Sequence, residues 1–281
     1  MTDNSDVLRL PERLFESGNF YLPLKQSSGD HSALHLQMPV ALLEDDGLKR
    51  FIFAEFHGPG FEIIERRLLC NLLAEGGMFI DVGAHFGLYS IVLADSVPDL
   101  QCLAIEPAVD NMRVLSENVA ANGLSGRITL AECALGDHTG IGHLRSNSSM
   151  GNHLAGHNSA PRESDIPVQV QTLCSLLASV LPSDYRTGPL WIKIDTEGRE
   201  ASVLRGAEEL FSAGVVEGVL WEFRVGHLVN PDTDSIVSFF RKYDFESFSV
   251  SHSNMISVRG RKAKKTLLEL GFLARLESHT S

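Results

Sequence analysis

The sequence has few cysteines, few aromatic residues and a deficit of basic residues. Its four cysteines lie far apart, form no CxxC pair and fall mostly in apolar segments, so we expect reduced thiols that pack as small hydrophobic side chains. The 24 Lys and Arg residues against 36 Asp and Glu residues give a net charge of -12, which argues against nonspecific binding to nucleic acid or to anionic membranes.

Long apolar runs are missing as well. No run reaches the length that spans a membrane, and the start of the chain lacks the basic and apolar segments of a signal peptide. We therefore expect a cytoplasmic protein with no membrane partner and no nucleic-acid partner. The 281 residues are 43% hydrophobic, which is enough to bury a large core. We predict an N-terminal cap over residues 1–60, a main domain over 61–258 and a basic C-terminal tail over 259–281.

The segment FIDVGAHFGLYS, residues 79–90, is the most informative stretch. An apolar run ends in Asp81, Gly83 and Gly87 bracket a short turn, and apolar residues at helical spacing follow. This order predicts a buried strand, a tight turn and a helix, which together form the first step of a nucleotide-binding sheet. Glycine lets a ligand approach the backbone, and the helix N-terminus offers unpaired N–H groups. We therefore predict a cofactor site that contains Asp81, Gly83, Ala84, His85 and Gly87.

A second strand is expected over residues 102–105, followed by Glu106 and Pro107. In a doubly wound sheet Glu106 would lie at the carboxyl edge of the neighbouring strand, where its carboxylate can accept hydrogen bonds from a ribose diol. The alternative is that Glu106 only caps the helix that begins near Ala108. On the first interpretation Glu106 and Pro107 belong to the same cofactor site.

The residue two positions after Gly83 bears on which nucleotide could bind. A dinucleotide fingerprint has the pattern GxGxxG, whose middle glycine clears space for a pyrophosphate. Here that residue is His85, whose side chain would crowd the space. S-adenosylmethionine carries adenine, ribose and an amino-acid tail but no phosphate. The sequence therefore favours a methyl donor over NAD.

Two more strands would bring acidic side chains to the same edge of the sheet. Glu132 follows a predicted strand over 127–131, and it could accept from an adenine amino group or be a solvated loop residue. Asp195 follows a predicted strand over 190–194 and would point at the ligand crevice. Glu200, close behind it, is expected to serve the first turn of the next helix, where the helix dipole favours an acidic side chain.

The N-terminal and C-terminal segments complete the predicted fold. We expect strands over residues 32–43 and 50–57 in the cap and an antiparallel strand pair over 245–250 and 254–258. The basic run over 259–265 is expected to be solvated, and a short amphipathic helix over 266–276 is expected after it.

Residues 136–165 lose periodicity and are rich in Gly, Ser, Asn and His. We predict a long loop that reaches over the substrate. His153 and His157 are four residues apart, so metal binding is an alternative, but the glycines around them disfavour the helix that such a site would need.

Several motifs in order resemble the FkbM-type S-adenosylmethionine-dependent methyltransferases. The sequence contains FIDVGAHFGLYSIVLA from residue 79, IEP at 105–107, ENVAANG at 117–123, ALGD at 134–137 and, most specifically, IKIDTEGREASVLRGA at 192–207. The resemblance covers roughly residues 62–258.

The resemblance implies an α/β fold with a Rossmann-like class I methyltransferase sheet of seven strands, the last of them antiparallel. It implies S-adenosylmethionine as the cofactor and O-methylation of a hydroxyl on a small molecule, a glycan or a polyketide-like product. It also implies that Asp81, Gly83 and Gly87 hold the methionine part, that Glu106 holds the ribose, and that Cys133 and Ala134 line the adenine. Two residues depart from the family pattern: His85 stands where Asn is usual, and Cys174 where Asp is common.

Because a sulfonium methyl group is already activated, alignment and fixed dipoles would supply most of the catalysis. A base near the acceptor oxygen would help, since an alcohol has a high pKa. Asp195 is the first candidate for a base or an acceptor-orienting group, followed by His227, whose ordinary pKa suits proton transfer near neutral pH, and by Glu222. A structural role is the alternative for His227.

No metal site is predicted, because the spacing of Asp195 and Glu197 alone is weak support for Mg²⁺ coordination. The expected partner is a small-molecule or glycan acceptor, and a homodimer is left open. Two other functions also remain open. One is a nicotinamide-dependent oxidoreductase, which His85 disfavours, and the other is a catalytically silent binding protein with a cofactor fold.

Overall fold

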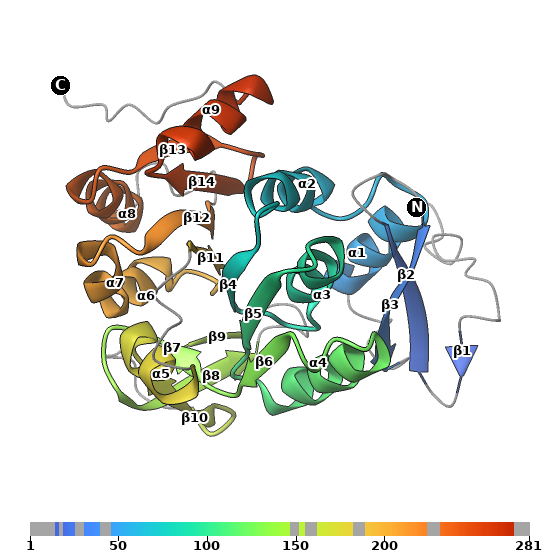
Figure 1. The fold of residues 1–281 in the computed structure, drawn as a ribbon. Helices are drawn as coiled ribbons and strands as arrows, with labels where there is room; N and C mark the ends of the chain where they lie inside the picture. Colours follow the sequence, from blue (N-terminus) through green and yellow to red (C-terminus); the bar gives the residue numbers. More distant parts are fainter. Residues whose placement is uncertain are drawn as a thin grey trace, which may run out of the picture.

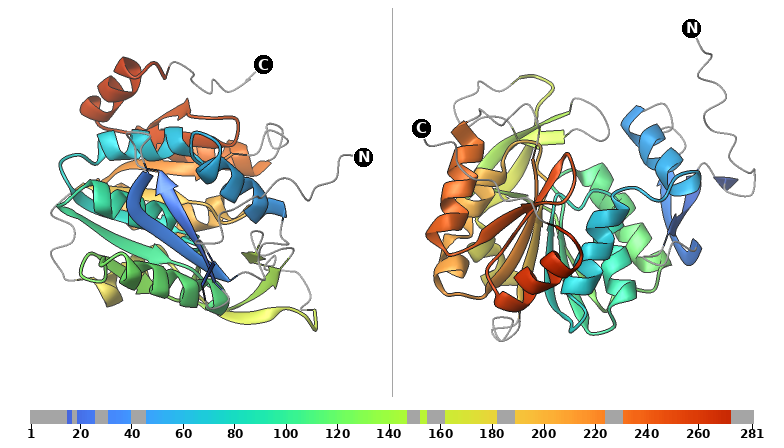
Figure 2. Two further views of the ribbon diagram at one scale, coloured as in Figure 1. Left: turned by 90° about the vertical axis from the view of Figure 1, so that its right-hand side faces the viewer. Right: turned by 90° about the horizontal axis from the view of Figure 1, so that it is seen from above.

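The computed structural model describes residues 15–16, 19–25, 31–39, 46–146, 152–154, 162–181, 189–223 and 231–272. A central sheet lies between two layers of helices, and two smaller sheets lie beside it (Figure 1, Figure 2). None of the helices in these ranges is long and apolar enough to cross a membrane.

The central sheet has seven strands in the order β13-β14-β12-β11-β4-β5-β6. Strand β14 is antiparallel to both of its neighbours, and the other pairings in the sheet are parallel. This confirms the predicted α/β sheet with the last strand antiparallel. The strands are β4 (Gly77–Val82), β5 (Leu100–Ile105), β6 (Ile128–Ala131), β11 (Leu190–Ile194), β12 (Val216–Glu222), β13 (Glu246–Ser249) and β14 (Asn254–Val258).

Helices cover both faces of this sheet because its strands are apolar on both sides. Successive strand residues point to opposite faces, so Phe79 packs into one core cluster and Ile80 into the other. The first cluster includes residues of α2 (Ile63–Leu72), α3 (Leu88–Ser96), α4 (Val109–Ala121) and α9 (Arg261–Glu269). The second includes residues of α5 (Leu173–Val180), α6 (Glu200–Gly206), α7 (Glu208–Ser212) and α8 (Pro231–Lys242).

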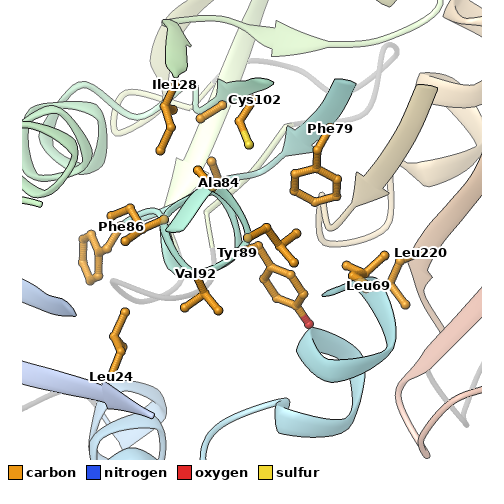
Figure 3. Packing of buried hydrophobic residues seen from close by; sticks show 14 of the residues in the cluster. Leu24, Leu69, Phe79, Ala84, Phe86, Tyr89, Val92, Cys102, Ile128 and Leu220 are labelled. Carbon is orange, nitrogen blue, oxygen red and sulfur yellow. The ribbon is translucent and has the colours of Figure 1, made fainter. Parts of the chain in front are cut away.

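A small N-terminal unit, which we call the cap, packs on the first of these faces. It consists of β1 (Phe15–Glu16), β2 (Asn19–Lys25) and β3 (His31–Pro39), which form an antiparallel sheet, and of α1 (Asp46–Phe56). Leu24 of β2 belongs to the same core cluster as Phe86 and Val92, toward which it points in Figure 3. The cap and the central sheet therefore share one hydrophobic core.

The strand predicted over residues 50–57 is wrong, because this segment belongs to helix α1. Its buried residues Leu48, Ile52 and Glu55 recur at the spacing of a helix. The run FIFAEF is apolar except for Glu55, and a short apolar run of this kind fits a buried strand as well as a buried helix.

The loop predicted over residues 136–165 is also partly wrong. It contains β8 (Gly140–Ser146) and β9 (Asn152–Leu154), which join β7 (Ala134–Leu135) and β10 (Ile166–Gln171) in a second sheet of order β7-β10-β8-β9. Strand β8 forms because β10, distant in sequence, supplies an edge with which it can pair. His157 lies outside the described residues.

The basic run over 259–265 is not a free tail. Most of it lies in α9, which begins earlier than the predicted helix and buries Ala263 and Leu267. These two residues are four apart, so they lie on one side of the helix, and they belong to the core cluster that includes α2. The basic side chains occupy the remaining surface of α9.

Candidate active site

A cavity of about 270 Å³ lies at the carboxyl ends of β4, β5, β11 and β12. Ligands bind at this edge in open α/β sheets, where the strand order changes direction. Val82 of β4, Ile105 of β5, Lys193 of β11 and Glu222 of β12 all line the cavity. The site is therefore built by strands that the hydrophobic core holds in fixed register.

The turn over residues 83–87, which we call the cofactor turn, forms one wall. The N–H groups of Gly83 and Ala84 both donate to the carbonyl oxygen of Ile105, 3.0 Å away, which ties the turn to the end of β5. Gly83 has φ 79°, and a Cβ built on it would overlap the carbonyl oxygen of Asp195. Gly83, Ala84 and His85 all line the cavity.

Gly87 and Asp81 do not line the cavity but hold the start of α3. Gly87 precedes the helix at φ 94°, and a Cβ there would meet Leu115 at 2.6 Å. Asp81 is buried, and its Oδ2 accepts from the Ser90 hydroxyl at 2.7 Å and from the Ser90 N–H at 3.2 Å. Burial raises the pKa of Asp81, and the nearby Lys193 charge opposes that effect.

Glu106 lies at the carboxyl end of β5 and is only 4% exposed. Its Oε2 accepts from the His85 N–H at 2.9 Å, and its Oε1 accepts from the Ala108 N–H at 3.0 Å and from Asn111 at 3.3 Å. Burial raises its pKa, while the two backbone hydrogen bonds favour the ionised form. Glu106 and Pro107 line the cavity, and the bond to Ala108 means that Glu106 also caps α4.

The residues after β6 divide between the cavity and the surface. Cys133 and Ala134 line the cavity, and burial raises the pKa of the Cys133 thiol to about 11, so it stays a neutral group. Glu132 is exposed and is not among the lining residues. This wall is therefore apolar, which suits the flat face of an aromatic ring.

Lys193 and Asp195 lie two residues apart on one edge of the cavity. The Lys193 ammonium is 3.0 Å from Asp195 Oδ2, 3.9 Å from Asp81 Oδ1 and 4.7 Å from the centre of the Tyr89 ring. Burial disfavours the charged ammonium, but Asp195, Asp81 and Glu62 outweigh burial and raise the pKa of Lys193. Asp195 lines the cavity, and its carboxylate pairs with the Lys193 ammonium.

A second polar network reaches the cavity from α2, α3 and β14. The Tyr89 hydroxyl points toward α2 (Figure 3) and donates to Glu62 Oε2 at 2.7 Å. Asn254 donates to Glu62 Oε1 and to Glu65 Oε1, each at 3.1 Å. Burial raises the pKa of Glu62 and of Tyr89. The network joins distant parts of the chain, because Glu62 and Asn254 are 192 positions apart in the sequence.

Three carboxylates meet where β11 and β12 end. Asp195, Glu197 and Glu222 offer oxygens within 4.8 Å of one another. Burial, followed by the charges of Asp195 and Glu200, raises the pKa of Glu222 to about 8. Acidic groups are often this close without an ion, so the arrangement alone assigns no metal to the site. His227, the other predicted catalytic residue, lies outside the described residues.

Glu200 has a structural role, as predicted from its place in the first turn of α6. Its Oε1 accepts from the Thr196 N–H, the Thr196 hydroxyl and the Gly198 N–H at 3.0 to 3.1 Å. The turn that carries Glu197, whose φ is 55°, is held in place by these bonds.

Several lining residues are not found by reasoning from the sequence. Lys193 offered a signal, because a lysine within the apolar strand LWIKI needs a buried partner. Tyr89 lies in the stretch 79–90, but nothing in that motif marked its side chain as part of the site, and Glu62, Leu36 and Phe51 belong to no motif. Backbone strain is concentrated at the site. Four described residues other than glycine have positive φ, and three of the four line the cavity: Glu62, His85 and Glu197.

The family model and the two curated relatives that match this chain are all methyltransferases. The profile described as "Methyltransferase FkbM domain" matches residues 81–247. Methyltransferase sdnD of Sordaria araneosa is 28% identical over 162 residues, which are 49% of this chain and 62% of that protein. Ribosomal RNA small subunit methyltransferase G of Rhodococcus jostii is 38% identical over 87 residues, which are 29% of this chain and 37% of that protein. The chain thus spans less than two thirds of either relative.

Solved structures with a related arrangement share little sequence with this chain. The O-methyltransferase TomG of Streptomyces achromogenes, in complex with SAM, is 15% identical, has a TM-score of 0.41 and covers 79% of this chain and 93% of its own. TYW2 of M. jannaschii, in complex with AdoMet, is 10% identical, has a TM-score of 0.42 and covers 87% of this chain and 86% of its own. Likeness at this level carries no argument about function.

Proposed function

The chain belongs to the FkbM methyltransferase family, whose cofactor is S-adenosylmethionine, and from that premise we propose that it is an O-methyltransferase. The acceptor in this proposal is a hydroxyl group of a small molecule, a sugar or glycan, or a secondary metabolite. The observation that carries the proposal is Glu106, a carboxylate at the carboxyl end of β5, beside the cofactor turn and inside the cavity.

The residues of the cavity fit the cofactor in three respects. Glu106 can accept a hydrogen bond from a ribose hydroxyl at Oε2, since a carboxylate has about four acceptor positions and His85, Ala108 and Asn111 use three of them. Cys133 and Ala134 provide an apolar wall for the adenine. His85 occupies the position that must be small for a pyrophosphate, so a donor without phosphate fits better. On the same proposal Gly83 lets the methionine part approach the backbone.

In the proposed reaction S-adenosylmethionine supplies an activated methyl group. The chain must then orient the acceptor and remove its proton, because an alcohol is a poor nucleophile while protonated. We assign these tasks to Asp195, which lines the cavity at 3.0 Å from the Lys193 ammonium, and to Glu222 close to it. Lys193 fixes the direction of the Asp195 carboxylate, so that its other oxygen can face the acceptor.

Calorimetric titration of the full chain tests the cofactor. We expect micromolar binding of S-adenosylmethionine and no binding of NAD. Binding of NAD alone would overturn the proposal in favour of a nicotinamide oxidoreductase. Radiolabelled methyl transfer to a panel of hydroxylated acceptors then tests the activity, and the absence of transfer to any compound that binds beside the cofactor would favour a silent binding protein.

Replacement of Asp195 by Asn tests the catalytic assignment. We expect Asp195→Asn to lower methyl transfer by about 100-fold or more, because a positioned base contributes at least this much. The affinity for S-adenosylmethionine should change little. Asp234→Asn, at an exposed position of α8, is the control and should behave like the wild type. Turnover at the wild-type level in Asp195→Asn would remove this residue from the mechanism.

A further inference from the structure

Asn118 of α4 has 0% exposure and joins two walls of the cavity. Its Oδ1 accepts from the Gln37 N–H of β3 at 2.6 Å, and its Nδ2 donates to the carbonyl oxygen of Phe86 in the cofactor turn at 3.0 Å. One side-chain amide thus satisfies a backbone donor in the cap and a backbone acceptor in the cofactor turn. The bond to Phe86 is buried and the bond to Gln37 is partly buried, so a group left without its partner in either bond would be costly.

Asn122, one turn later in α4, holds the same strand but not the cofactor turn. Its Oδ1 accepts from the His35 N–H at 3.2 Å, and its Nδ2 donates to the His35 carbonyl oxygen at 2.8 Å. Together Asn118 and Asn122 cover the edge of β3 that does not pair with β2. The residues of β3 that they bond, His35 and Gln37, lie on either side of Leu36 in the sequence. Leu36 and Phe86 both line the cavity.

We propose that Asn118 is a positioning residue that couples the cap to the cofactor turn, so that cofactor binding and the seating of Leu36 against the cavity are linked. The inference rests on the proposed function, because the ligand that orders the turn is S-adenosylmethionine. The coupling follows from the geometry. If the Phe86 carbonyl shifts, the Asn118 side-chain amide that donates to it shifts as well, and the bond from the Gln37 N–H to the same amide changes. Asn122 bonds to His35 and, through Nδ2, to the Asn118 carbonyl oxygen of α4 at 2.8 Å, so it fastens the cap to α4 rather than to the cofactor turn.

The isosteric variant Asn118→Asp separates the two bonds. A carboxylate oxygen still accepts from the Gln37 N–H, whereas the other oxygen faces the Phe86 carbonyl and cannot donate to it. Asn122→Ala does the reverse, because it releases His35 and leaves the Phe86 bond in place. Asn71→Ala is the control for asparagine replacement, since Asn71 is exposed on α2 and its side chain donates to the Arg67 carbonyl of the same helix.

Two measurements on the full-length chain test the coupling: the Kd for S-adenosylmethionine by calorimetry, and amide hydrogen exchange of peptides from residues 31–39 with and without saturating cofactor. In the wild type we expect the cofactor to slow exchange in β3. In Asn118→Asp we expect a Kd about tenfold higher and loss of the cofactor-induced slowing. In Asn122→Ala exchange should be faster without cofactor but still slowed by it, with Kd changed by about threefold or less.

A purely structural role for Asn118 predicts a different result. Asn118→Asp would then bind the cofactor like Asn71→Ala and would show the full slowing of exchange in β3, and that outcome overturns the inference. If the new charge prevents folding, Asn118→Ala serves instead, because it removes both bonds without burying a charge. Failure of the wild type to bind S-adenosylmethionine overturns the proposed function, and this inference with it, whereas normal binding by every variant overturns this inference alone.

Discussion

Gly83 follows β4 and lies against the backbone of Asp195, which follows the neighbouring strand β11. The carbonyl oxygen of Asp195 occupies the space that a Cβ on Gly83 would need, and φ is 79°. The position therefore requires glycine for two reasons, the backbone conformation and the close approach of a second strand. The cofactor turn and the Asp195 carboxylate are brought together by this contact.

We expect Gly83→Ala to abolish measurable binding of S-adenosylmethionine and to destabilise the fold by more than the strain of a positive φ, which is about 1–2 kcal/mol. Gly123→Ala is the matched control. Gly123 has φ 70°, but no atom of the described residues other than its chain neighbours lies within 4 Å of a Cβ built there, so only the strain should remain. Urea unfolding and calorimetry measure the two effects. Equal behaviour of the two variants would contradict the importance of the close approach.

Glu222 makes stability depend on pH. Its pKa is raised from the ordinary 4.5 to about 8 by burial and then by Asp195 and Glu200. In the folded state it keeps a proton that the unfolded chain has released, so its contribution to stability is complete below the unfolded pKa of 4.5 and is lost as the pH rises through about 8.

We therefore expect the melting temperature of the wild type to fall more steeply with rising pH, between about 5 and 8, than that of Glu222→Gln. The glutamine variant cannot lose a proton, so it lacks this contribution to the slope. Thermal unfolding at a series of pH values compares the two proteins. Parallel curves would show that Glu222 titrates in the same way in the folded and unfolded chain.

At the scale of elements, a buried ion pair joins the cap to the main fold. Glu55 of α1 and Arg66 of α2 form it, and the Phe61 N–H between the two helices donates to Glu55 Oε1 at 2.7 Å. Both side chains are almost completely buried. The pair therefore fixes how α1 lies against α2, and with it the place of Phe51, which lines the cavity.

We expect Glu55→Gln to destabilise the fold by about 3 kcal/mol or more, because it leaves the Arg66 charge buried without its carboxylate. Glu117→Gln is the control. Glu117 pairs with Arg113 on the exposed side of α4, and a pair of that kind contributes about 0.5 kcal/mol or less. Urea unfolding gives both values. If Glu55→Gln lowers the free energy of unfolding no more than Glu117→Gln does, the cap docks without help from this ion pair.

At the scale of the whole molecule, the cap and the central sheet share one hydrophobic core. Residues of β2, β3 and α1 belong to the same core cluster as residues of β4, α3 and α4. The cavity draws on both, since Leu36 and Phe51 line it together with the cofactor turn.

We expect a single calorimetric unfolding transition for the full chain, because the cap and the central sheet bury their apolar residues in the same core cluster. S-adenosylmethionine should shift the whole transition upward, by about 2.7 kcal/mol in stability when its concentration is 100 times Kd. A first transition that is insensitive to the cofactor, followed by a second that responds to it, would show instead that the cap unfolds separately.

The order of strands and helices in the main domain could be read from local patterns. Apolar runs that end in Asp81, Glu106 and Asp195 predicted buried strands and the edge at which they end, and the structure has strands β4, β5 and β11 there. Segments whose conformation depends on distant partners were predicted incorrectly. Residues 50–56 are helical because the side of α1 that carries Phe51, Ile52 and Glu55 is buried in the core, and β8 exists because β10 pairs with it.

The sequence by itself determined the α/β fold, the cofactor turn and the acidic residues at the strand ends, because strand, turn and helix signals act over a few neighbouring residues. Only the tertiary structure decided that Lys193 lies beside Asp81, that Glu62, Tyr89 and Asn254 form one network, and that Asn118 joins β3 to the cofactor turn. These contacts join segments far apart in the chain. No periodicity records such partners, because they meet only when the core closes.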